Sequence, residues 1–399
     1  MAHDGTISDS ARRLGPGVIA IGLASLLSDL GHETATAVLP LFLMAIGGSP
    51  LTLGLVEGVA DFASSAAKLW AGHLGGRLAR RKVPAAGAYF LTAVATASIG
   101  LAAHWLHVLL GRTAAWLGRG FRGPLRDTLL AEQTHPSGYG RAFGFERAMD
   151  TVGAILGPLF ALALLSVAAP LRTILLVTLV PGALAAVLFL TVRERGGVRP
   201  GRSFRSMAAS LPPNFRRFLL AVGVFGAGDF SRTLLILWAL GVGVHIEGGG
   251  ELTVPVLLYA GYNAVSAASS YVSGDWSDRL GRRPLLLFGY AVAAAVGLLM
   301  AFDVRSLPIL VAVFVGSGIY VGIEEALERS TAADLLPDSH RAFGFGALAA
   351  VNGLGDLVSS VLIGLLWQTA GASVAFGAAA ALCLLGVLLL TRVEFVGRR

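Results

Sequence analysis

The 399-residue chain has little cysteine, little charge and few aromatic residues. Its single cysteine, Cys383, excludes a disulfide framework and a cysteine-based metal cluster. Aromatic residues make up 8% of the chain, which argues against a large aromatic drug pocket. Charged residues make up 14%, whereas an average soluble chain has about 25%. This deficit extends along the whole length and predicts a polytopic membrane protein.

The motifs of common enzymes and pumps are also missing. No His, Cys and Asp residues have metal-ligand spacing, and His104 and His107 are expected to be solvated. The segment Gly118-Arg-Gly120 lacks the strand–loop–helix context of a phosphate-binding loop. We therefore expect no enzyme activity, no metal, no cofactor and no ATP-driven pumping. Residues 1–13 are polar and the first apolar run is too long for a signal core, so no signal peptide is expected.

Twelve apolar runs are each close to the ~20 residues that cross a bilayer. They predict an all-α membrane protein with two six-helix halves, residues 1–192 and 218–399, joined by a linker at 193–217. The predicted spans are 17–46, 51–72, 84–104, 106–131, 141–167, 171–192, 218–243, 252–274, 284–303, 308–335, 341–367 and 372–391.

The placement of Lys and Arg predicts the orientation in the membrane. With twelve spans, 21 of these residues fall on the side of the termini and only Arg172 and Arg305 on the other side. The positive-inside rule then places both termini and the linker in the cytoplasm, in a cell (plasma or bacterial inner) membrane. This placement explains the net charge of +7 better than nucleic-acid binding does.

Two sequence echoes indicate a tandem duplication. The turn Gly72-His-Leu-Gly-Gly-Arg77-Leu-Ala-Arg80-Arg81 corresponds, at an offset of 202 residues, to Gly274-Asp-Trp-Ser-Asp278-Arg279-Leu-Gly281-Arg282-Arg283. The segment Arg141-Ala-Phe-Gly-Phe145 recurs at 341–345. Each half is therefore expected to repeat the other in structure.

Twenty charged residues lie within or at the ends of the predicted spans. A charge in hydrocarbon costs several kcal/mol unless it is paired or faces a wet cavity, so the chain must enclose a polar interior. The twenty are Asp29, Glu33, Glu57, Asp61, Lys68, Arg112, Arg119, Arg122, Arg126, Asp127, Glu146, Arg147, Asp150, Asp229, Arg232, Glu324, Glu325, Glu328, Arg329 and Asp356.

The fourth and tenth spans keep charged positions but exchange their signs. Side chains of opposite charge at equivalent positions could pair across the central axis, or each could pair with neighbouring helices of its own half. Some of these side chains could also bind substrate. At the offset of 202, the matching positions are Arg122 with Glu324, Arg126 with Glu328, and Asp127 with Arg329.

The first span offers the best proton site. Asp29 and Glu33 are four residues apart, so they share a helix face, with His32 beside them. When two carboxyl groups lie this close together in a low dielectric, ionisation of both costs much free energy. One of them is therefore expected to keep its proton near neutral pH, as a residue that binds and releases protons must. The alternative is a pair neutralised by arginines of the fourth span. Asp229 stands at the matching place in the seventh span, and Glu57 and Asp61 repeat the spacing in the second.

These features resemble the major facilitator superfamily of secondary transporters, whose turn motif reads Gly-x-Leu-x-Asp-Arg-x-Gly-Arg-Arg/Lys. The second copy departs from it at Trp276, and the first copy has Gly76 for the Asp and Ala79 for the Gly. In the family, the Asp of the first turn latches the outward-facing state. The resemblance therefore implies that the latch has moved to Asp278, near Arg141 and Phe143.

The resemblance also implies roles for one further motif and one further residue. Gly153-Ala-Ile-Leu-Gly157-Pro158 is similar to the family's antiporter motif, which implies efflux by exchange. Arg112 resembles the arginine of the fourth helix that is implicated in proton coupling, where it would tune Asp29 and Glu33.

The sequence as a whole predicts proton-coupled export of a small molecule by a monomer in the bilayer. Asp29 and Glu33 would carry protons, and the charged fourth and tenth spans would gate or bind. Two alternatives remain open: uptake or exchange of a small anion attracted by Arg119, Arg122 and Arg126, and a sensor or scaffold that transports nothing.

Overall fold

The computed structural model describes residues 14–75, 78, 80–134, 139–194, 211–243, 252–302, 306–337 and 341–394, and within these ranges the chain is helical with no strand. This confirms the predicted all-α fold. The helices of the first half are α1 (Pro16–Ala45), α2 (Pro50–Gly75), α3 (Lys82–Ser98) with a 3-10 turn η2 (Ile99–Leu101), α4 (Trp105–Glu132), α5 (Tyr139–Ser166), α6 (Leu171–Val177) and α7 (Leu179–Phe189). Those of the second half are α9 (Pro213–Gly226), α10 (Arg232–Val242), α11 (Thr253–Leu280), α12 (Arg282–Ala301), α13 (Leu307–Leu335), α14 (Arg341–Ala370) and α15 (Ala372–Leu390).

The helices are consistent with twelve spans, but two spans are interrupted. The sixth is divided at Thr178 into α6 and α7, and the seventh is divided between Gly226 and Arg232 into α9 and α10. In the second break, a Cβ on Gly228 would lie 2.6 Å from the carbonyl oxygen of Ala379, so the backbone approaches α15 closely there. The interruption places Asp229 outside regular helix.

The charged turn after the eighth span is shorter than the sequence predicted. Helix α11 continues through Gly274, Asp278 and Leu280, and only Gly281 separates it from α12. Gly281 has φ of 83°, a conformation that glycine adopts without the steric cost of a side chain. Most of this motif is therefore helical.

Seven segments of the described chain are long and apolar enough to cross a membrane by length and composition. They are 82–101, 141–166, 171–189, 282–301, 307–335, 344–370 and 372–390. The helices α1, α2, α4, α11 and the α9–α10 pair fall outside this set. These are helices that carry many of the polar residues described below.

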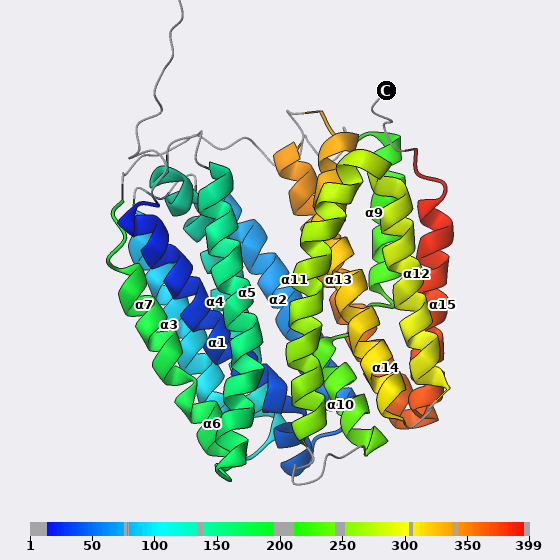
Figure 1. Cartoon of the computed structure of the whole chain (residues 1–399), viewed down its shortest axis with the longest axis horizontal. Helices are drawn as coiled ribbons and strands as arrows, with labels where there is room; N and C mark the ends of the chain where they lie inside the picture. The colour runs from blue at the N-terminus through cyan, green and yellow to red at the C-terminus, as the bar shows by residue number, and fades with distance from the viewer. Residues whose placement is uncertain are drawn as a thin grey trace, which may run out of the picture.

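The helices form two groups that lie side by side (Figure 1). In the first group, α1 packs on α5 and α7, and α4 packs on α2 and α3; in the second, α11 packs on α13, and α12 on α15. The groups meet where α2 packs on α14 and α5 packs on α11. Small residues permit the first contact, since a Cβ on Gly54 would lie 2.1 Å from the carbonyl oxygen of Ser360.

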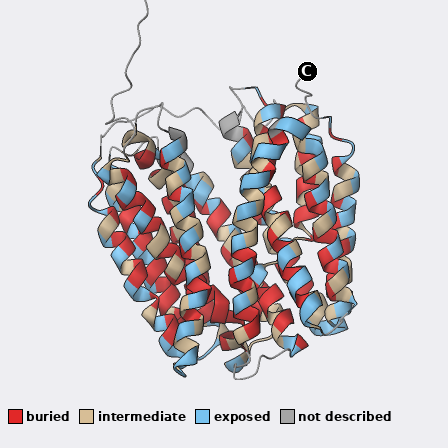
Figure 2. Cartoon of the chain, in the orientation of Figure 1, coloured by how far each residue is buried: buried red, intermediate tan, exposed pale blue. Residues whose placement is uncertain are grey.

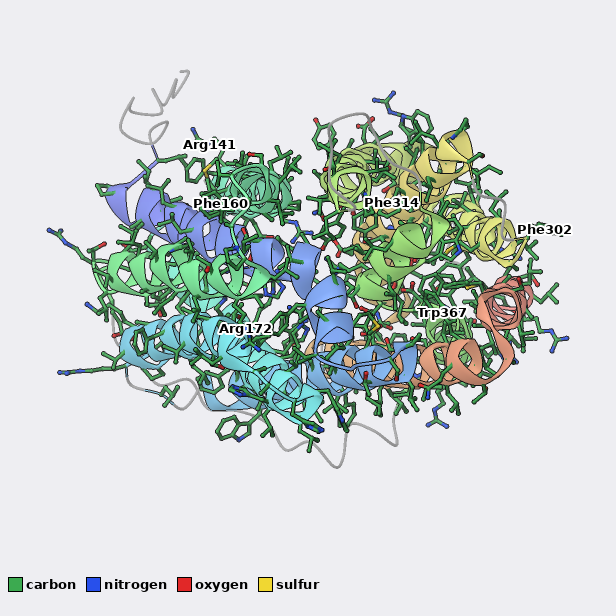
Figure 3. The ribbon with its side chains drawn as sticks, turned by 90° about the horizontal axis from the view of Figure 1, so that it is seen from below. Arg141, Phe160, Arg172, Phe302, Phe314 and Trp367 are labelled. Atoms are coloured by element: carbon green, nitrogen blue, oxygen red, sulfur yellow. The ribbon has the colours of Figure 1, made fainter. Side chains whose placement is uncertain are left out.

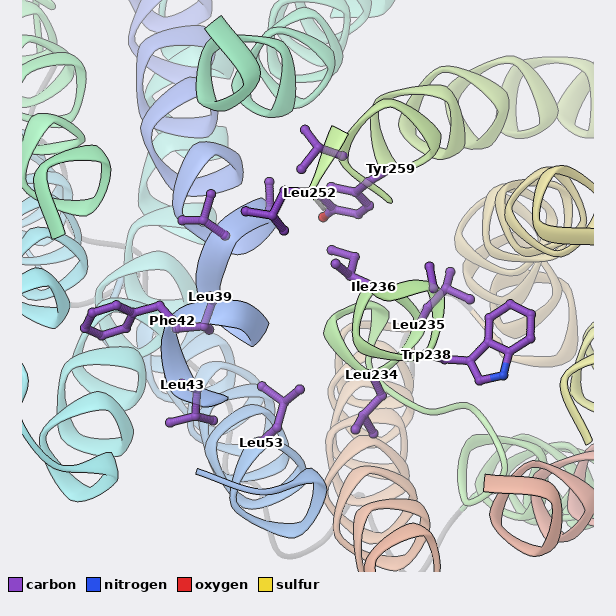
Figure 4. Close-up of a cluster of buried hydrophobic side chains, with 14 of the residues drawn as sticks. Leu39, Phe42, Leu43, Leu53, Leu234, Leu235, Ile236, Trp238, Leu252 and Tyr259 are labelled. Atoms are coloured by element: carbon purple, nitrogen blue, oxygen red, sulfur yellow. The ribbon is translucent and has the colours of Figure 1, made fainter. Parts of the chain in front are cut away.

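The buried apolar side chains show where the two groups are joined. One cluster includes residues of both groups, among them Leu39 and Phe42 of α1 and Leu235 and Trp238 of α10, at the end away from the C-terminus (Figures 1 and 4). At the end that carries the C-terminus, each group has its own cluster, one around Phe189 and the other around Phe215 (Figure 2). The groups therefore share a core at one end only.

Arg172 belongs to the end with the shared core (Figure 3). Its guanidinium donates to the carbonyl oxygen of Gly100 at 3.0 Å and lies over the ring of Phe42 at 5.5 Å. This cation therefore stabilises the end of the third span and the shared core.

Candidate functional site

Asp29 is buried on α1 and pairs with arginines of α4. Its Oδ2 lies 3.0 Å from Nη2 of Arg119, and its Oδ1 lies 3.4 Å from Nη2 of Arg122. Arg122 also donates to the hydroxyl of Ser28 and lies over the ring of Tyr89 at 4.1 Å. The arrangement agrees with the alternative in which arginines of the fourth span neutralise this carboxylate.

Glu33, one turn along α1, has a different environment, with partners from both groups of helices. The hydroxyl of Tyr259 on α11 donates to its Oε2 at 2.5 Å, and Nη1 of Arg232 on α10 lies 3.7 Å from its Oε1. His32 of α1 approaches the same oxygen at 3.9 Å. The side chain of Glu33 is 3% exposed, whereas that of Arg232 is 43% exposed, so the carboxylate itself is buried at the edge of the shared core.

Arg112 lies beside Glu57, not beside Asp29 or Glu33 as the sequence predicted. Its Nε is 3.1 Å from Oε1 of Glu57, and its guanidinium lies over the ring of Trp116 at 3.6 Å. An influence of Arg112 on the carboxylates of α1 would therefore be indirect.

Trp116 connects this pair to two other candidate residues. The indole Nε1 donates to Oδ1 of Asp61 at 2.5 Å, and the ring lies 4.2 Å from the ring of His32. Asp61 is therefore turned inward to the network rather than toward the headgroups. Tryptophan in an apolar run gives no sequence signal for such a role, so sequence reasoning missed it.

At the sign-exchanged positions, Arg126 of α4 and Glu328 of α13 have partners in their own half rather than across the axis. Arg126 lies 2.6 Å from Glu146 and 3.0 Å from Asp127. Glu328 accepts hydrogen bonds from the hydroxyl of Tyr290 and, at 2.8 Å, from Nδ2 of Asn352. The cross-axis pairing that the sign exchange left open is therefore not the arrangement observed.

The remaining charged candidates lie in the second group. Asp229 accepts a hydrogen bond from the hydroxyl of Tyr320 at 2.8 Å and lies within hydrogen-bonding reach of Glu324. Arg329 is exposed. Asp229 and Glu328 are thus held by hydroxyl and amide donors, whereas Asp29 and Glu57 of the first group are held by arginines.

An ion pair that the sequence did not predict joins the two groups nearer the end with separate cores. Arg147 of α5 lies 2.7 Å from Glu325 of α13 and 3.1 Å from Asp150. Asn263 of α11 also donates to the carbonyl oxygen of Ala154 at 3.0 Å. Both residues of the ion pair are exposed, in contrast to Glu33.

The Gly153–Pro158 motif packs α5 against the part of α1 that carries the carboxylates. A Cβ on Gly153 would lie 2.4 Å from the carbonyl oxygen of Leu26, and a Cβ on Gly157 would lie 2.7 Å from Cβ of Glu33. The hydroxyl of Thr34 donates to the carbonyl oxygen of Gly157 at 3.0 Å. Glycine is required there because the two backbones are in contact.

The two turns pair with corresponding acidic residues, Glu132 and Asp334, but through arginines at different positions of the repeat. Arg81 lies 2.6 Å from Glu132 at the end of α4, and Arg282 pairs with Asp334 at the end of α13. Arg283 donates to the carbonyl oxygen of Thr391 at 2.7 Å. Residue Arg77 and the side chain of Asp278 lie outside the described part of the chain, so the predicted latch stays a prediction.

The described residues contain no group of three or more His, Cys, Asp or Glu side chains that could hold a metal ion. The chemistry of the site is instead that of buried carboxylates and arginines, most of them paired within one helical group, with Glu33 in contact with both groups. Such groups can bind charged ligands and protons.

Comparison with known proteins identifies the family. The model described as Major Facilitator Superfamily matches residues 21–257 and 249–398. An uncharacterised MFS-type transporter of Methanocaldococcus jannaschii is 29% identical over 365 residues, which are 90% of this chain and 91% of that protein. The class H tetracycline resistance protein of Pasteurella multocida is 34% identical over 110 residues, or 28% of this chain and 27% of that protein.

Solved structures agree with the fold. An inward-facing, occupied bacterial homologue of the human lysosomal transporter Spinster has a TM-score of 0.75 at 16% identity, over 94% of this chain and 96% of that one. With the family model matched over most of its length, the chain belongs to the Major Facilitator Superfamily and is a multi-pass membrane transporter rather than an enzyme.

Proposed function

We propose that this transporter exports a small molecule in exchange for protons by alternating access, with Glu33 as the coupling carboxylate. The observation that carries the proposal is the position of Glu33. It is buried on α1 of the first group, and it is held by Tyr259 and Arg232 of the second group. A change in its charge therefore acts directly on the contact between the halves.

The distribution of the apolar cores supports an inward-facing conformation. The halves share an apolar core at the end with Leu39 and Trp238, and they have separate cores at the end with the C-terminus. The Lys and Arg count supports a cytoplasmic position for the termini. The closed end is then the outer one, and the predicted halves 1–192 and 218–399 would rock about it.

The contacts of Glu33 suggest how exchange is enforced. A hydrogen bond to a charged acceptor is about twice as strong as one between neutral groups, so ionised Glu33 holds Tyr259 most tightly. The ionised carboxylate also attracts the guanidinium of Arg232, 3.7 Å away. A proton, or a cationic group of the substrate, neutralises the carboxylate and loosens the closed end. The empty, ionised carrier stays closed, so the two ligands cross in alternation.

The second carboxylate pair fits a role in binding. Asp229 lies in the break of the seventh span, within hydrogen-bonding reach of Glu324. Two carboxyl groups within hydrogen-bonding reach of each other can share one proton or attract one cation. Interrupted helices are typical of transporter binding sites.

A partial relative is named for resistance to tetracycline, which agrees with export. One observation favours the alternative of anion exchange: Nη1 of Arg119 is buried and has no hydrogen-bond partner within the described chain. An anionic substrate that accepts from this nitrogen would make Arg119 a binding residue and the carboxylates structural.

The test is proton flux in proteoliposomes with an internal pH dye and a panel of cationic, anionic and neutral compounds. Wild type is compared with Glu33→Gln and with the control Asp275→Asn, which removes an exposed carboxylate of a surface i,i+4 pair. A compound that collapses a pH gradient in wild type and control but not in Glu33→Gln supports the proposal. Transport of an anion without proton flux favours anion exchange, and binding without any flux favours the sensor.

A further inference from the structure

A groove of about 560 Å³ lies on the outer surface of the first helical group, and its lining is almost wholly apolar. Helix α4 forms the floor, because α2 and α3 both pack on α4, and the sides come from α2 and α3. The volume falls within the range of small-ligand pockets, about 300–1,000 Å³. The lining residues include Ala66 and Trp70 of α2, Gly87 and Leu91 of α3, and Leu117 and Phe121 of α4.

Glycines shape this groove. A Cβ on Gly118 would lie 2.8 Å from the carbonyl oxygen of Ala88, and a Cβ on Gly120 would lie 2.2 Å from that of Ser64, so α4 sits deep between its neighbours. Gly87 is different, because a Cβ there would meet no atom within 4 Å. The groove is therefore a cleft with a close-packed floor and open space above Gly87.

The groove faces away from the contact between the halves. On α2, Ser65 and Leu69 meet α14, since a Cβ on Gly353 would lie 2.4 Å from Cβ of Ser65 and one on Gly346 would lie 3.0 Å from Leu69. Ala66 and Trp70 lie on the groove side. Trp70 is 60% exposed, and tryptophan is typical of the level where hydrocarbon meets headgroups. The groove thus runs from headgroup level into the hydrocarbon.

Positive charge stands over the headgroup end of the groove. Lys82 begins α3 two residues before Pro84, which lines the groove, and Arg80 is exposed just before it. The neighbouring Arg81 is paired with Glu132, and the backbone N–H groups of Arg81 and Lys82 donate to Glu194. Within the described chain, no ion-pair partner is found for the side chains of Arg80 and Lys82, which can face an anion.

From the apolar cleft and this charge we infer that the groove binds one anionic phospholipid of the leaflet on the side of the termini. An acyl chain would lie along Gly87 and Leu91, and the phosphate would face Arg80 and Lys82. The bound lipid fixes α4 between α2 and α3, and α4 also carries Arg119 and Arg122, which hold Asp29. Anionic lipid therefore regulates the carrier through the helix that supports its charged interior.

The test uses the purified full chain and native mass spectrometry with phosphatidylglycerol or phosphatidylcholine bearing the same acyl chains. Gly87→Phe fills the groove. Gly144→Phe is the control, because it is also the sixth residue of its helix, exposed, and open within 4 Å. We expect wild type and Gly144→Phe to retain one phosphatidylglycerol molecule in preference to phosphatidylcholine, and Gly87→Phe to retain neither.

The double variant Arg80→Gln/Lys82→Gln tests the headgroup. Each basic residue near an anionic surface contributes about fivefold in affinity, so removal of two should lower the preference for phosphatidylglycerol by about 25-fold. Leu91→Trp, a second variant that fills the groove, keeps the test informative if Gly87→Phe does not fold. Retention of lipid by both groove-filling variants, or equal retention of the two lipids by wild type, would overturn the inference. So would wild type that retains neither lipid, which would leave the groove to a lipophilic substrate.

Discussion

Replacement of Tyr259 by phenylalanine tests whether its bond to Glu33 holds the closed end together. The change removes one hydroxyl, which donates to Oε2 of Glu33 at 2.5 Å, and leaves the ring in place. A hydrogen bond to a charged group contributes about 1.5–3 kcal/mol. Loss of this bond should therefore shift the balance between closed and open states of that end by about 10- to 150-fold toward the open state.

The assay measures the distance between labels at that end. Val167 and Phe302 are 73% and 75% exposed, and they belong to different groups of helices, so Val167→Cys and Phe302→Cys carry spin labels in a Cys383→Ala background. Tyr259→Phe should increase the population with the longer distance. An unchanged distance distribution would show that this bond does not hold the closed end and would remove the basis for coupling through Glu33.

A neighbouring tyrosine supplies the matched control. The ring of Tyr262 stacks on that of Tyr259 at 5.7 Å, and it is also buried. Within the described chain, no hydrogen bond joins its hydroxyl to Glu33. Tyr262→Phe should therefore leave the distance distribution at that of wild type. A shift as large as that of Tyr259→Phe would assign the effect to loss of a hydroxyl in general.

Four other substitutions test the packing and the charges. Gly157→Val, whose Cβ would lie 2.7 Å from Cβ of Glu33, should abolish transport and lower the apparent melting temperature; wild-type transport would refute the close approach of α5. Asp29→Asn leaves the two arginines of α4 without their carboxylate and should cost about 3 kcal/mol, or roughly 5 °C in apparent melting temperature, whereas Glu328→Gln keeps a hydrogen-bond acceptor and should cost less than about 1 kcal/mol. Equal losses in thermal unfolding would contradict the different pairing of the two halves. Cys383→Ala, a small change at a buried apolar position, should change transport rate and melting temperature little, and a large loss would show a role beyond packing.

The twelve spans could be predicted because apolar length and basic loops are local properties of the sequence. The break between α9 and α10 could not, because a hydropathy window averages over the few residues from Ala227 to Ser231. The start of α9 at Pro213 also precedes the predicted span at 218, since a polar first turn continues the helix beyond the apolar run. The length of an apolar run therefore predicts that a helix is present, but it does not predict the residue at which the helix begins or ends.

The candidate site could be predicted in part. Asp29 and Glu33 were found because a charge in an apolar span needs an explanation, and charge alone is visible in the sequence. Their partners were not found, because an uncharged Tyr259 or Trp116 in an apolar run looks like any lipid-facing residue. Which arginine pairs with which carboxylate depends on the rotation of each helix about its axis. Asp29 and Glu33 are one helical turn apart on α1, yet Asp29 pairs with α4 and Glu33 contacts the other half.

The sign exchange between α4 and α13 has a consequence for alternating access. Arg126 pairs within the first half, and its counterpart Glu328 is satisfied within the second. Contacts within a half move with it when rigid halves rock, so they do not differ between states. Among the described ion pairs, those of Arg232 with Glu33 and of Arg147 with Glu325 cross between the halves. The second pair is exposed and screened by water, so its contribution is small. This difference is the reason that we propose buried Glu33 as the residue at which a proton most changes the balance between states.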